Sequence, residues 1–366
     1  MRIGIIGLGL IGASLAKAIK RVHASNSYII GYDTNLSSTN AAYKEGVIDR
    51  VASSIGESFS SCTVIFLCTP VHYTSSIVEQ LLPFMANDCI LTDMGSTKYE
   101  LVYAVDKLIK NSNKRVYFVG GHPMAGSEKS GYSSSTPYLF ENAYYILTPI
   151  SDTPDFIIFI LQKMVERIGA IPLILSPTYH DYATANVSHL PHIIASSLVQ
   201  LIKQNDGDNK YLHTLAAGGF KDITRIASSN PDIWVAICLS NKKQLQKVFS
   251  KYHSILLGFF DALEQEDTEK IYNFFDNARS YRNTFSDNIS GGLVKTFTLY
   301  VDAKDEPGIL AAITTLLSAN KINIKNIGVM NHREFESGVI RIVLEDKTTM
   351  LNASEILVKH GYSIYY

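Results

Sequence analysis

The sequence predicts an α/β domain, followed by an all-α domain and by a small ferredoxin-like domain with the element order βαββαβ. Short apolar strands alternate with helical segments in the first half of the chain. Long helical periodicity with few glycines follows, and the end of the chain returns to strands that alternate with helices. The length of 366 residues suits two or three domains, which we expect at residues 1–176, 177–288 and 295–366.

The composition is that of an ordinary globular protein, with 46% hydrophobic and 18% charged residues. The formal net charge is −1 and no long basic run occurs, so nucleic acid and anionic membranes are poor candidate partners. No stretch reaches the roughly 20 uninterrupted apolar residues of a membrane span, and the apolar start resembles no signal peptide. The four cysteines show no metal or redox spacing, which predicts no metal site and a reducing, cytoplasmic setting.

A glycine-rich fingerprint for a dinucleotide opens the chain. A predicted strand at 2–6 runs into Gly-Leu-Gly-Leu-Ile-Gly at 7–12, and helical sequence continues from there. In a Rossmann domain the first glycine makes the tight turn, the second lets the pyrophosphate approach, and the third packs helix on strand. The N–H groups at the helix start would hold the phosphates. The predicted cofactor contacts of this turn are Gly7, Gly9, Leu10, Ile11 and Gly12.

A second predicted strand, 28–32, ends in Asp33. An acidic side chain at this distance from the fingerprint holds the ribose hydroxyls of NAD. Thr34 and Asn35 follow, and no arginine is present there to meet a 2′-phosphate, so we expect NAD rather than NADP. The alternative is that Asp33 only caps the next helix.

Two further strands should end at the same edge of the sheet. The first, 64–67, has an exit loop that should cover the cofactor with Cys68, Thr69 and Pro70. The second, 89–92, leads into a loop that carries Ser96. Ligands bind beyond the carboxyl ends of such strands, so Ser96 should lie beside the nicotinamide. It could also be only the N-cap of the following helix.

Glycines and a proline surround one histidine, His122, just after the apolar run 116–119. Glycine lets a backbone approach a ligand closely, and Pro123 stiffens the neighbouring residue. Histidine is the side chain most easily tuned to take a proton near neutral pH. We therefore expect a loop that holds one base at the end of a strand, although a structural histidine in a turn remains the alternative. Strands near 144–147 and 171–175 should complete the sheet.

The helical segment contains two polar stretches. One has His180 and Asp181, followed by Ser-His-Leu-Pro-His at 188–192, whose histidines should share a helix face. Pro191 between them and the lack of further ligands argue against a metal pair. The other stretch ends in Arg225, which could clamp a carboxylate or pair with Asp222; spacing alone does not separate these two interpretations.

Several motifs, in this order along the chain, resemble those of prephenate dehydrogenases. They are the fingerprint at 7–12, Asp-Met-Gly-Ser at 93–96, the glycine-rich segment at 121–131, Ser-His-Leu-Pro-His at 188–192 and Gly-Phe-Lys-Asp-Ile-Thr-Arg at 219–225. The tail, with Asp-Glu-Pro-Gly at 305–308, resembles an ACT domain that follows a linker at 287–292. The resemblance implies a Rossmann domain, a helical domain that forms a homodimer, and a regulatory domain.

The resemblance also implies a reaction, in which prephenate and NAD+ give 4-hydroxyphenylpyruvate, carbon dioxide and NADH. Neutral His122 would accept the proton of the ring hydroxyl as general base, and Ser96 would position that hydroxyl. The two carboxylates of prephenate require a buried arginine, and Arg225 matches that position. His192 would support the pyruvyl end. Trp234 would be reached from the partner subunit. Further polar residues expected at this site are Glu128, Asp181 and Lys221.

The tail should bind an aromatic amino acid as feedback inhibitor, with L-tyrosine as the expected effector. A glycine at the strand-to-helix turn leaves room for an amino acid, and the helix start can meet its carboxylate. The expected contacts are Asp305, Pro307, Gly308 and Ile309. The alternative is a plain turn in a dimerisation module.

Three rival functions remain open at this point. An arogenate dehydrogenase would share the fold and the hydride step, and the sequence does not separate the two substrates. A β-hydroxyacid dehydrogenase would have a similar plan but depends on a lysine in the helical domain, which the His122 segment disfavours. An amino-acid sensor with a relict dinucleotide domain is disfavoured by the intact fingerprint together with Asp33, Ser96 and Arg225.

Overall fold

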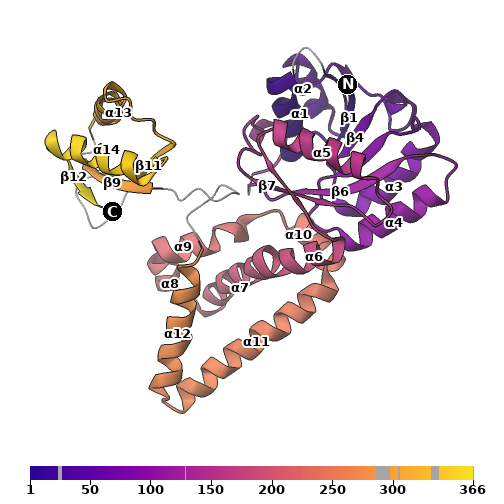
Figure 1. Cartoon of the computed structure of the whole chain (residues 1–366). Helices are drawn as coiled ribbons and strands as arrows, with labels where there is room; N and C mark the ends of the chain where they lie inside the picture. Colours follow the sequence, from indigo (N-terminus) through magenta and orange to yellow (C-terminus); the bar gives the residue numbers. More distant parts are fainter. Residues whose placement is uncertain (24–26, 128, 286–296, 304–305, 331–337, 366) are drawn as a thin grey trace. The chain divides into compact units, whose positions relative to one another are not determined.

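The computed structural model describes residues 1–23, 27–127, 129–285, 297–303, 306–330 and 338–365 (Figure 1). The chain divides into two compact units, Met1–Ile271 and Tyr272–Tyr366, which are described separately. Among the described residues, no helix combines the length and the apolar character needed to cross a membrane.

An eight-stranded sheet forms the centre of the first unit, in the order β3-β2-β1-β4-β5-β6-β7-β8. All neighbouring strands are parallel except β6 and β7, which are antiparallel. The predicted α/β domain is therefore confirmed. The strands are β1 (Arg2–Ile6), β2 (Tyr28–Tyr32), β3 (Arg50–Val51), β4 (Val64–Leu67), β5 (Ile90–Asp93), β6 (Tyr117–Pro123), β7 (Tyr144–Thr148) and β8 (Ile171–Ile174).

Helices cover both faces of this sheet, which explains why its strands are almost continuously apolar. One core cluster contains Leu15 of α1 and Leu161 of α5. The other contains Val78 of α3 and Val102 of α4, on the opposite face. The helices of this part are α1 (Leu10–His23), α2 (Leu36–Lys44), α3 (Val71–Leu81), α4 (Tyr99–Lys110) and α5 (Asp155–Arg167).

Strand β6 corrects one prediction, because His122 lies inside a strand rather than on a loop. The strand continues to Pro123 since β7 supplies an antiparallel partner, and His122 is paired with Ile146. The glycines serve close packing here, not a turn. A Cβ on Gly121 would lie 2.5 Å from the carbonyl oxygen of Asp93, and a Cβ on Gly120 would lie 2.4 Å from Oγ1 of Thr148.

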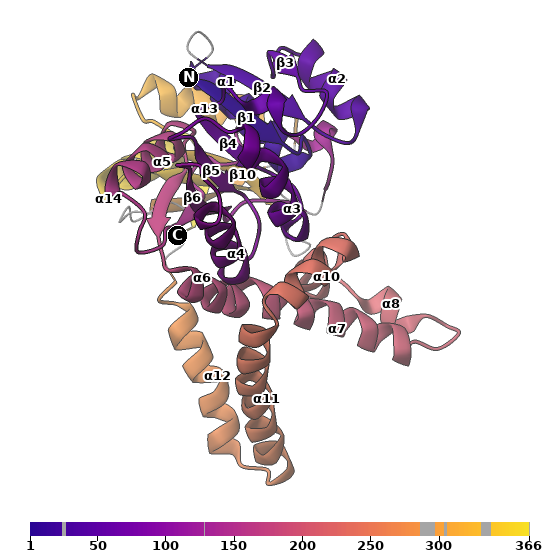
Figure 2. The ribbon, with the colours of Figure 1, turned by 90° about the vertical axis from the view of Figure 1, so that its right-hand side faces the viewer.

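The rest of the first unit is helical, as predicted, and joins the α/β part through α6 and α10. Helix α6 packs against α4 and β7, and α10 packs against α3, an arrangement that can be followed in Figure 2. The elements are α6 (Pro177–Thr184), a π-helical turn (Ala185–His189), α7 (Leu190–Asn205), α8 (Tyr211–Leu215), α9 (Gly218–Thr224), a 3-10 turn (Arg225–Ser228), α10 (Pro231–Ser240), α11 (Lys242–Glu264) and α12 (Thr268–Arg282), whose last part belongs to the second unit.

Helix α11 leaves a row of large apolar side chains exposed. They include Phe249, Ile255, Leu256 and Phe260. An apolar surface of this kind is uncommon on a monomer and is typical of an interface between subunits.

The second unit has the predicted βαββαβ order and an antiparallel sheet, β10-β11-β9-β12. Helix α14 begins at Lys347, because Asp346 caps it by accepting the N–H of Thr349 at 2.7 Å. The predicted linker at 287–292 lies outside the described residues. The elements are β9 (Phe297–Ala303), α13 (Ile309–Ala319), β10 (Asn326–Met330), β11 (Gly338–Leu344), α14 (Lys347–Lys359) and β12 (Ser363–Tyr365).

Candidate active site

The fingerprint turn has the backbone that dinucleotide binding requires. Gly7 adopts a φ of +96°, which favours glycine. A Cβ on Gly12 would lie 1.9 Å from the Gly7 carbonyl oxygen, so this position also excludes a side chain. At Gly9, by contrast, no atom lies within 4 Å of where a Cβ would stand. A pyrophosphate can therefore approach the backbone at Gly9, next to the start of α1 at Leu10 and Ile11.

Asp33 is held firmly beside this turn. Its carboxylate accepts the N–H of Leu8 at 2.6 Å and the N–H of Asn35 at 2.8 Å. The cap of α2 is Asn35, which accepts the N–H of Ser37, so the alternative that Asp33 only caps this helix is wrong. The carboxylate is placed where the ribose of a dinucleotide is expected.

The exit loop of β4 contains an unsatisfied polar atom. The Oγ1 atom of Thr69 is buried and has no hydrogen-bond partner among the described residues. Buried hydroxyls almost always have a partner, so this atom points to a ligand. Next to it, Cys68 is an inert thiol, because burial raises its pKa far above the usual value and the charge of Asp93 adds to the shift. Together with Gly9 and Asp33, Thr69 makes the site fit NAD.

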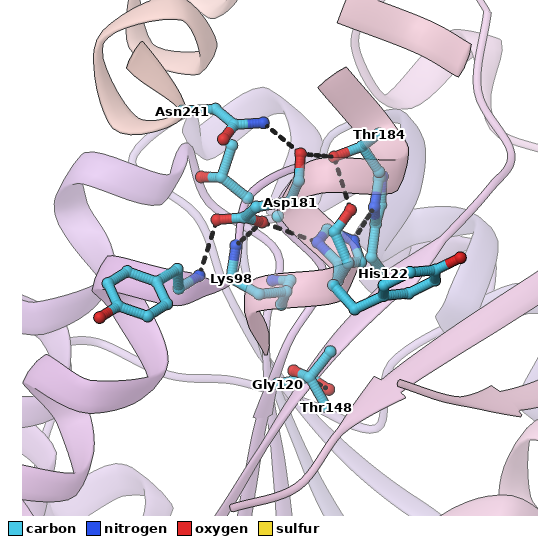
Figure 3. Close-up of polar contacts among 12 residues, drawn as sticks. Lys98, Gly120, His122, Thr148, Asp181, Thr184 and Asn241 are labelled. Atoms are coloured by element: carbon cyan, nitrogen blue, oxygen red, sulfur yellow. Dashed lines mark hydrogen bonds and ion pairs between the residues drawn. The ribbon is translucent and has the colours of Figure 1, made fainter. Parts of the chain in front are cut away.

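His122 is the last link of a chain of three side chains from two elements (Figure 3). Its Nδ1 lies 2.8 Å from Nε2 of His180, and Nδ1 of His180 lies 2.8 Å from Oδ1 of Asp181. Burial holds the pKa of His122 well below its usual value, and the positive charge of Lys98 acts in the same direction. His122 is therefore neutral at neutral pH, the state that a general base requires.

A buried ion pair supports the strand that carries His122. The ammonium of Lys98 contacts the carboxylate of Asp93, and their side chains are 0% and 1% exposed. Burial lowers the pKa of Lys98, and Asp93 opposes this shift. Asp93 also accepts the N–H of Gly121 at 3.1 Å and the N–H of Gly95 at 2.8 Å. It therefore ties the Ser96 loop to β6.

Ser96 lies half-buried between β5 and α4. Helix α4 begins at Tyr99 with Lys98 in the cap position, so the alternative that Ser96 is its N-cap is wrong. The cap comes from another helix instead: the carboxylate of Asp181 accepts the N–H of Lys98 at 2.7 Å and the N–H of Tyr99 at 2.8 Å. Asp181 thus holds the Ser96 loop in place and is itself 1% exposed.

His189 and His192 share a face, as predicted, and both rings contact Trp234 of the same chain. His192 is stacked on the indole with ring centroids 3.5 Å apart, whereas His189 meets its edge at 6.0 Å. The π-helical turn before α7 accommodates Pro191, which has no N–H to donate to an α-helical bond. A cavity of about 650 Å³ opens beside the stacked pair, lined also by Ser196, Gln200 and Cys238.

The residues of the expected carboxylate clamp lie on a different part of the helical segment from His189 and His192. Lys221 is on α9 and Arg225 begins the turn after it, and both elements pack against α7. Arg225, which we expected to be buried, is exposed in the single chain, as is Lys221. Glu128 lies outside the described residues.

In the second unit, Gly308 adopts a φ of +96° at the start of α13. No atom lies within 4 Å of where its Cβ would stand. Pro307 is exposed and Ile309 half-buried beside it, while Asp305 lies outside the described residues. The turn thus has room for a small ligand.

Sequence reasoning gave no role to Lys98, His180, His189 or Asn241. Asn241 donates to the carbonyl oxygen of Asp181 at 2.8 Å and to Nδ1 of His189 at 3.1 Å. The only feature of the sequence that could have pointed to these four residues is that they are polar residues in apolar surroundings. In the described part of the chain, no group of three or more His, Cys, Asp or Glu side chains is arranged to hold a metal ion.

Comparison with protein-family models identifies the three parts of the chain. Residues 15–173 match the nucleotide-binding domain of prephenate dehydrogenase, and residues 176–277 match the dimerization domain of prephenate dehydrogenase. Residues 299–359 match an ACT domain like that of the AHAS small subunit.

Characterised relatives and solved structures extend this similarity over the whole length. A prephenate dehydrogenase of Bacillus subtilis is 36% identical over 99% of this chain and 97% of its own. A crystal structure of prephenate dehydrogenase from A. aeolicus, in complex with hydroxyphenyl propionate and NAD+, is 34% identical with a TM-score of 0.72, covering 78% of this chain and 98% of its own. A Synechocystis arogenate dehydrogenase is 29% identical with a TM-score of 0.68, covering 78% and 100%.

Proposed function

The chain belongs to the prephenate dehydrogenase family, and on that premise we propose that it converts prephenate and NAD+ to 4-hydroxyphenylpyruvate, carbon dioxide and NADH. When bound, NAD+ accepts the hydride from the ring carbon that bears the hydroxyl. The bond to the ring carboxylate breaks, and its electron pair makes the ring aromatic. The oxygen that was the alcohol becomes the hydroxyl of a phenol, so atoms and charge balance.

His122 is the general base of this step. It accepts the proton of the ring hydroxyl as the hydride leaves, and it returns the proton to the phenol oxygen at the end. The observation that carries the proposal is the half-buried, neutral His122 held 2.8 Å from His180 at the carboxyl edge of a sheet with a dinucleotide fingerprint. Ser96, on the neighbouring loop, would position the same hydroxyl.

The substrate carboxylates require cationic partners, and Arg225 is the proposed clamp, with Lys221 on the preceding helix. His192, stacked on Trp234, would contact the pyruvyl end beside the cavity of about 650 Å³. Glu128 and Asp181 are the remaining proposed residues of the substrate site. Asp181 contributes by capping α4, which holds the Ser96 loop in place. The proposed NAD contacts are Gly7, Gly9, Leu10, Ile11, Gly12, Asp33, Cys68, Thr69 and Pro70.

Arogenate is the alternative substrate, because a solved arogenate dehydrogenase is 29% identical to this chain. Arogenate has an ammonium group where prephenate has the pyruvyl carbonyl. Initial rates of NADH formation from each substrate, with NAD+ and with NADP+, test the proposal. We expect the highest kcat/KM for prephenate with NAD+. Absence of NADH from both substrates would refute the proposed reaction, and a higher kcat/KM for arogenate would reassign the substrate.

The proposal also includes a homodimer and an amino-acid effector. The exposed apolar face of α11 would be covered in a homodimer, in keeping with the dimerization-domain match. The ACT domain would bind an amino acid, with L-tyrosine as the proposed effector, at the turn around Gly308. Asp305, Pro307 and Ile309 are the other proposed contacts. Calorimetric titration with tyrosine, phenylalanine and tryptophan tests this, and absence of binding by all three would leave the domain without this role.

A further inference from the structure

We propose that His180 is a positioning residue, which fixes the proton of His122 on Nδ1 and so presents the lone pair of Nε2 to the substrate. The inference deepens the proposed function and rests on it. His180 does not touch the reacting atoms in this account. It acts through His122, from a different element, α6.

The direction of each hydrogen bond follows from Asp181. This carboxylate accepts the N–H groups of Lys98 and Tyr99, at 2.7 and 2.8 Å, so each of its two oxygens acts as an acceptor. An ionised carboxylate only accepts, so Nδ1 of His180, 2.8 Å away, must be the donor. In neutral His180 the other nitrogen, Nε2, is then an acceptor. Nδ1 of His122, 2.8 Å from that atom, must therefore carry the proton.

The opposite arrangement would require a doubly protonated His180. Its ring is fully buried, and burial lowers its pKa. Lys98 opposes protonation as well, whereas Asp181 and Asp93 favour it. Burial is the largest of these influences, so the neutral ring prevails near neutral pH. With His180 neutral, the hydrogen bonds set the tautomer of His122, and its Nε2 can act as a base.

The chain of three side chains is also fixed in space. The Asp181 carbonyl oxygen accepts from Nδ2 of Asn241 at 2.8 Å, and the His180 carbonyl oxygen accepts from Oγ1 of Thr184 at 3.0 Å. These contacts hold both ends of the His180–Asp181 dipeptide in buried surroundings. With the backbone fixed in this way, rotation of the His180 ring would break the contacts of the ring with Asp181 and with His122 (Figure 3).

A pair of substitutions separates positioning from simple packing. His180→Phe fills the site but offers no acceptor to Nδ1 of His122. His180→Gln can place an amide oxygen near the former position of Nε2 and keeps that acceptor. We expect His180→Phe to lower kcat about 100-fold, in the range of lost general-base catalysis, with KM for prephenate and NAD+ within about threefold of wild type. The kcat of His180→Gln should be at least about tenfold higher than that of His180→Phe.

Nitrogen NMR of the full-length protein with labelled histidine gives a readout that needs no substrate. The His122 resonances are assigned by their loss in His122→Asn. In wild type we expect a protonated Nδ1 and an unprotonated Nε2 on His122, and in His180→Phe a mixture of the two tautomers. His360→Asn, a substitution of the exposed residue that follows α14, is the matched control and should change neither kcat nor the His122 signals.

Three results would overturn the inference: a proton on Nε2 of His122 in wild type, a normal kcat in His180→Phe, or equal losses of kcat in the Phe and Gln variants. The wild-type spectrum decides the matter even if His180→Phe does not fold. Wild-type protein with the expected tautomer but no NADH formation from prephenate or arogenate would refute the proposed function while leaving the hydrogen-bond chain intact.

Discussion

The carboxylate of Asp181 accepts the backbone N–H of Lys98 at 2.7 Å, so the helical segment closes the N-terminus of α4. This single contact joins two parts of the site. It fixes the end of the Ser96 loop, and a second contact of the same carboxylate, with Nδ1 of His180, orients His180 against His122. The catalytic base and the loop that meets the same substrate hydroxyl are thus positioned by one buried side chain.

Asp181→Ala should destabilise the first unit by at least about 2 kcal/mol. The substitution removes a helix cap and leaves buried N–H groups of Lys98 and Tyr99 without partners. Urea unfolding followed by circular dichroism measures the loss. The exposed Asp208→Ala is the matched control and should change the free energy of unfolding by less than about 0.5 kcal/mol. A loss below 1 kcal/mol for Asp181→Ala would contradict this role.

The pH dependence of kcat/KM should reveal the lowered pKa of His122. His122 must be neutral to accept a proton, so activity rises with pH through its pKa and is level above it. Burial lowers this pKa, and the nearby Lys98 acts in the same direction. The rise should therefore lie clearly below the ordinary histidine pKa of about 6.5. A rise centred at or above that value would mean that another group controls the step or that His122 is more exposed to water than its position indicates.

Asp33 should make NAD+ the preferred cofactor by at least about tenfold in kcat/KM. Unit charges about 4 Å apart near a protein surface repel by roughly 1–4 kcal/mol, and the 2′-phosphate of NADP+ would meet the fixed carboxylate of Asp33. Asp33→Ser should reduce the preference for NAD+ over NADP+. Asp88→Ser, which changes an exposed aspartate paired with Arg115, should leave that preference unchanged. Equal kcat/KM values for the two cofactors in wild type would refute this account of Asp33.

Arg225→Ala should raise KM for prephenate by about 10- to 100-fold, because a hydrogen bond to a charged group contributes roughly 1.5–3 kcal/mol. The Kd for NAD+ should remain within about twofold of wild type. Arg115→Ala, which changes a surface arginine paired with Asp88, is the control for loss of charge alone. Equal losses in the affinity for both ligands would indicate a folding defect and would contradict the clamp.

Patterns local in the chain predicted much of the fold. The strand at 2–6, the turn at 7–12 and the strand ending before Asp33 follow from residues that are close in sequence, because glycine and apolar periodicity act locally. The extent of β6 could not be read in this way. Its hydrogen bonds come from Tyr144–Thr148, and the glycines that suggested a loop are required by Asp93 and Thr148.

The candidate site was predicted in part for the same reason. His122 and Ser96 stood out in their own segments. The contact between His122 and His180 joins residues that are far apart in the chain, and neither segment alone indicates it. The role of Lys98 could not be read from the sequence, because a lysine at a helix start normally faces water. In the structure its side chain is fully buried beside Asp93.

The most direct measurement is NADH formation from prephenate by wild type and by His122→Asn, with NAD+ binding measured on both proteins. Asparagine can hold a hydrogen bond to His180 but cannot serve as a base near neutral pH. We expect kcat to fall by about 100- to 10,000-fold while the Kd for NAD+ stays within about twofold. His360→Asn should keep the wild-type rate. A near-normal kcat in His122→Asn would show that His122 is not the base and would contradict the central claim.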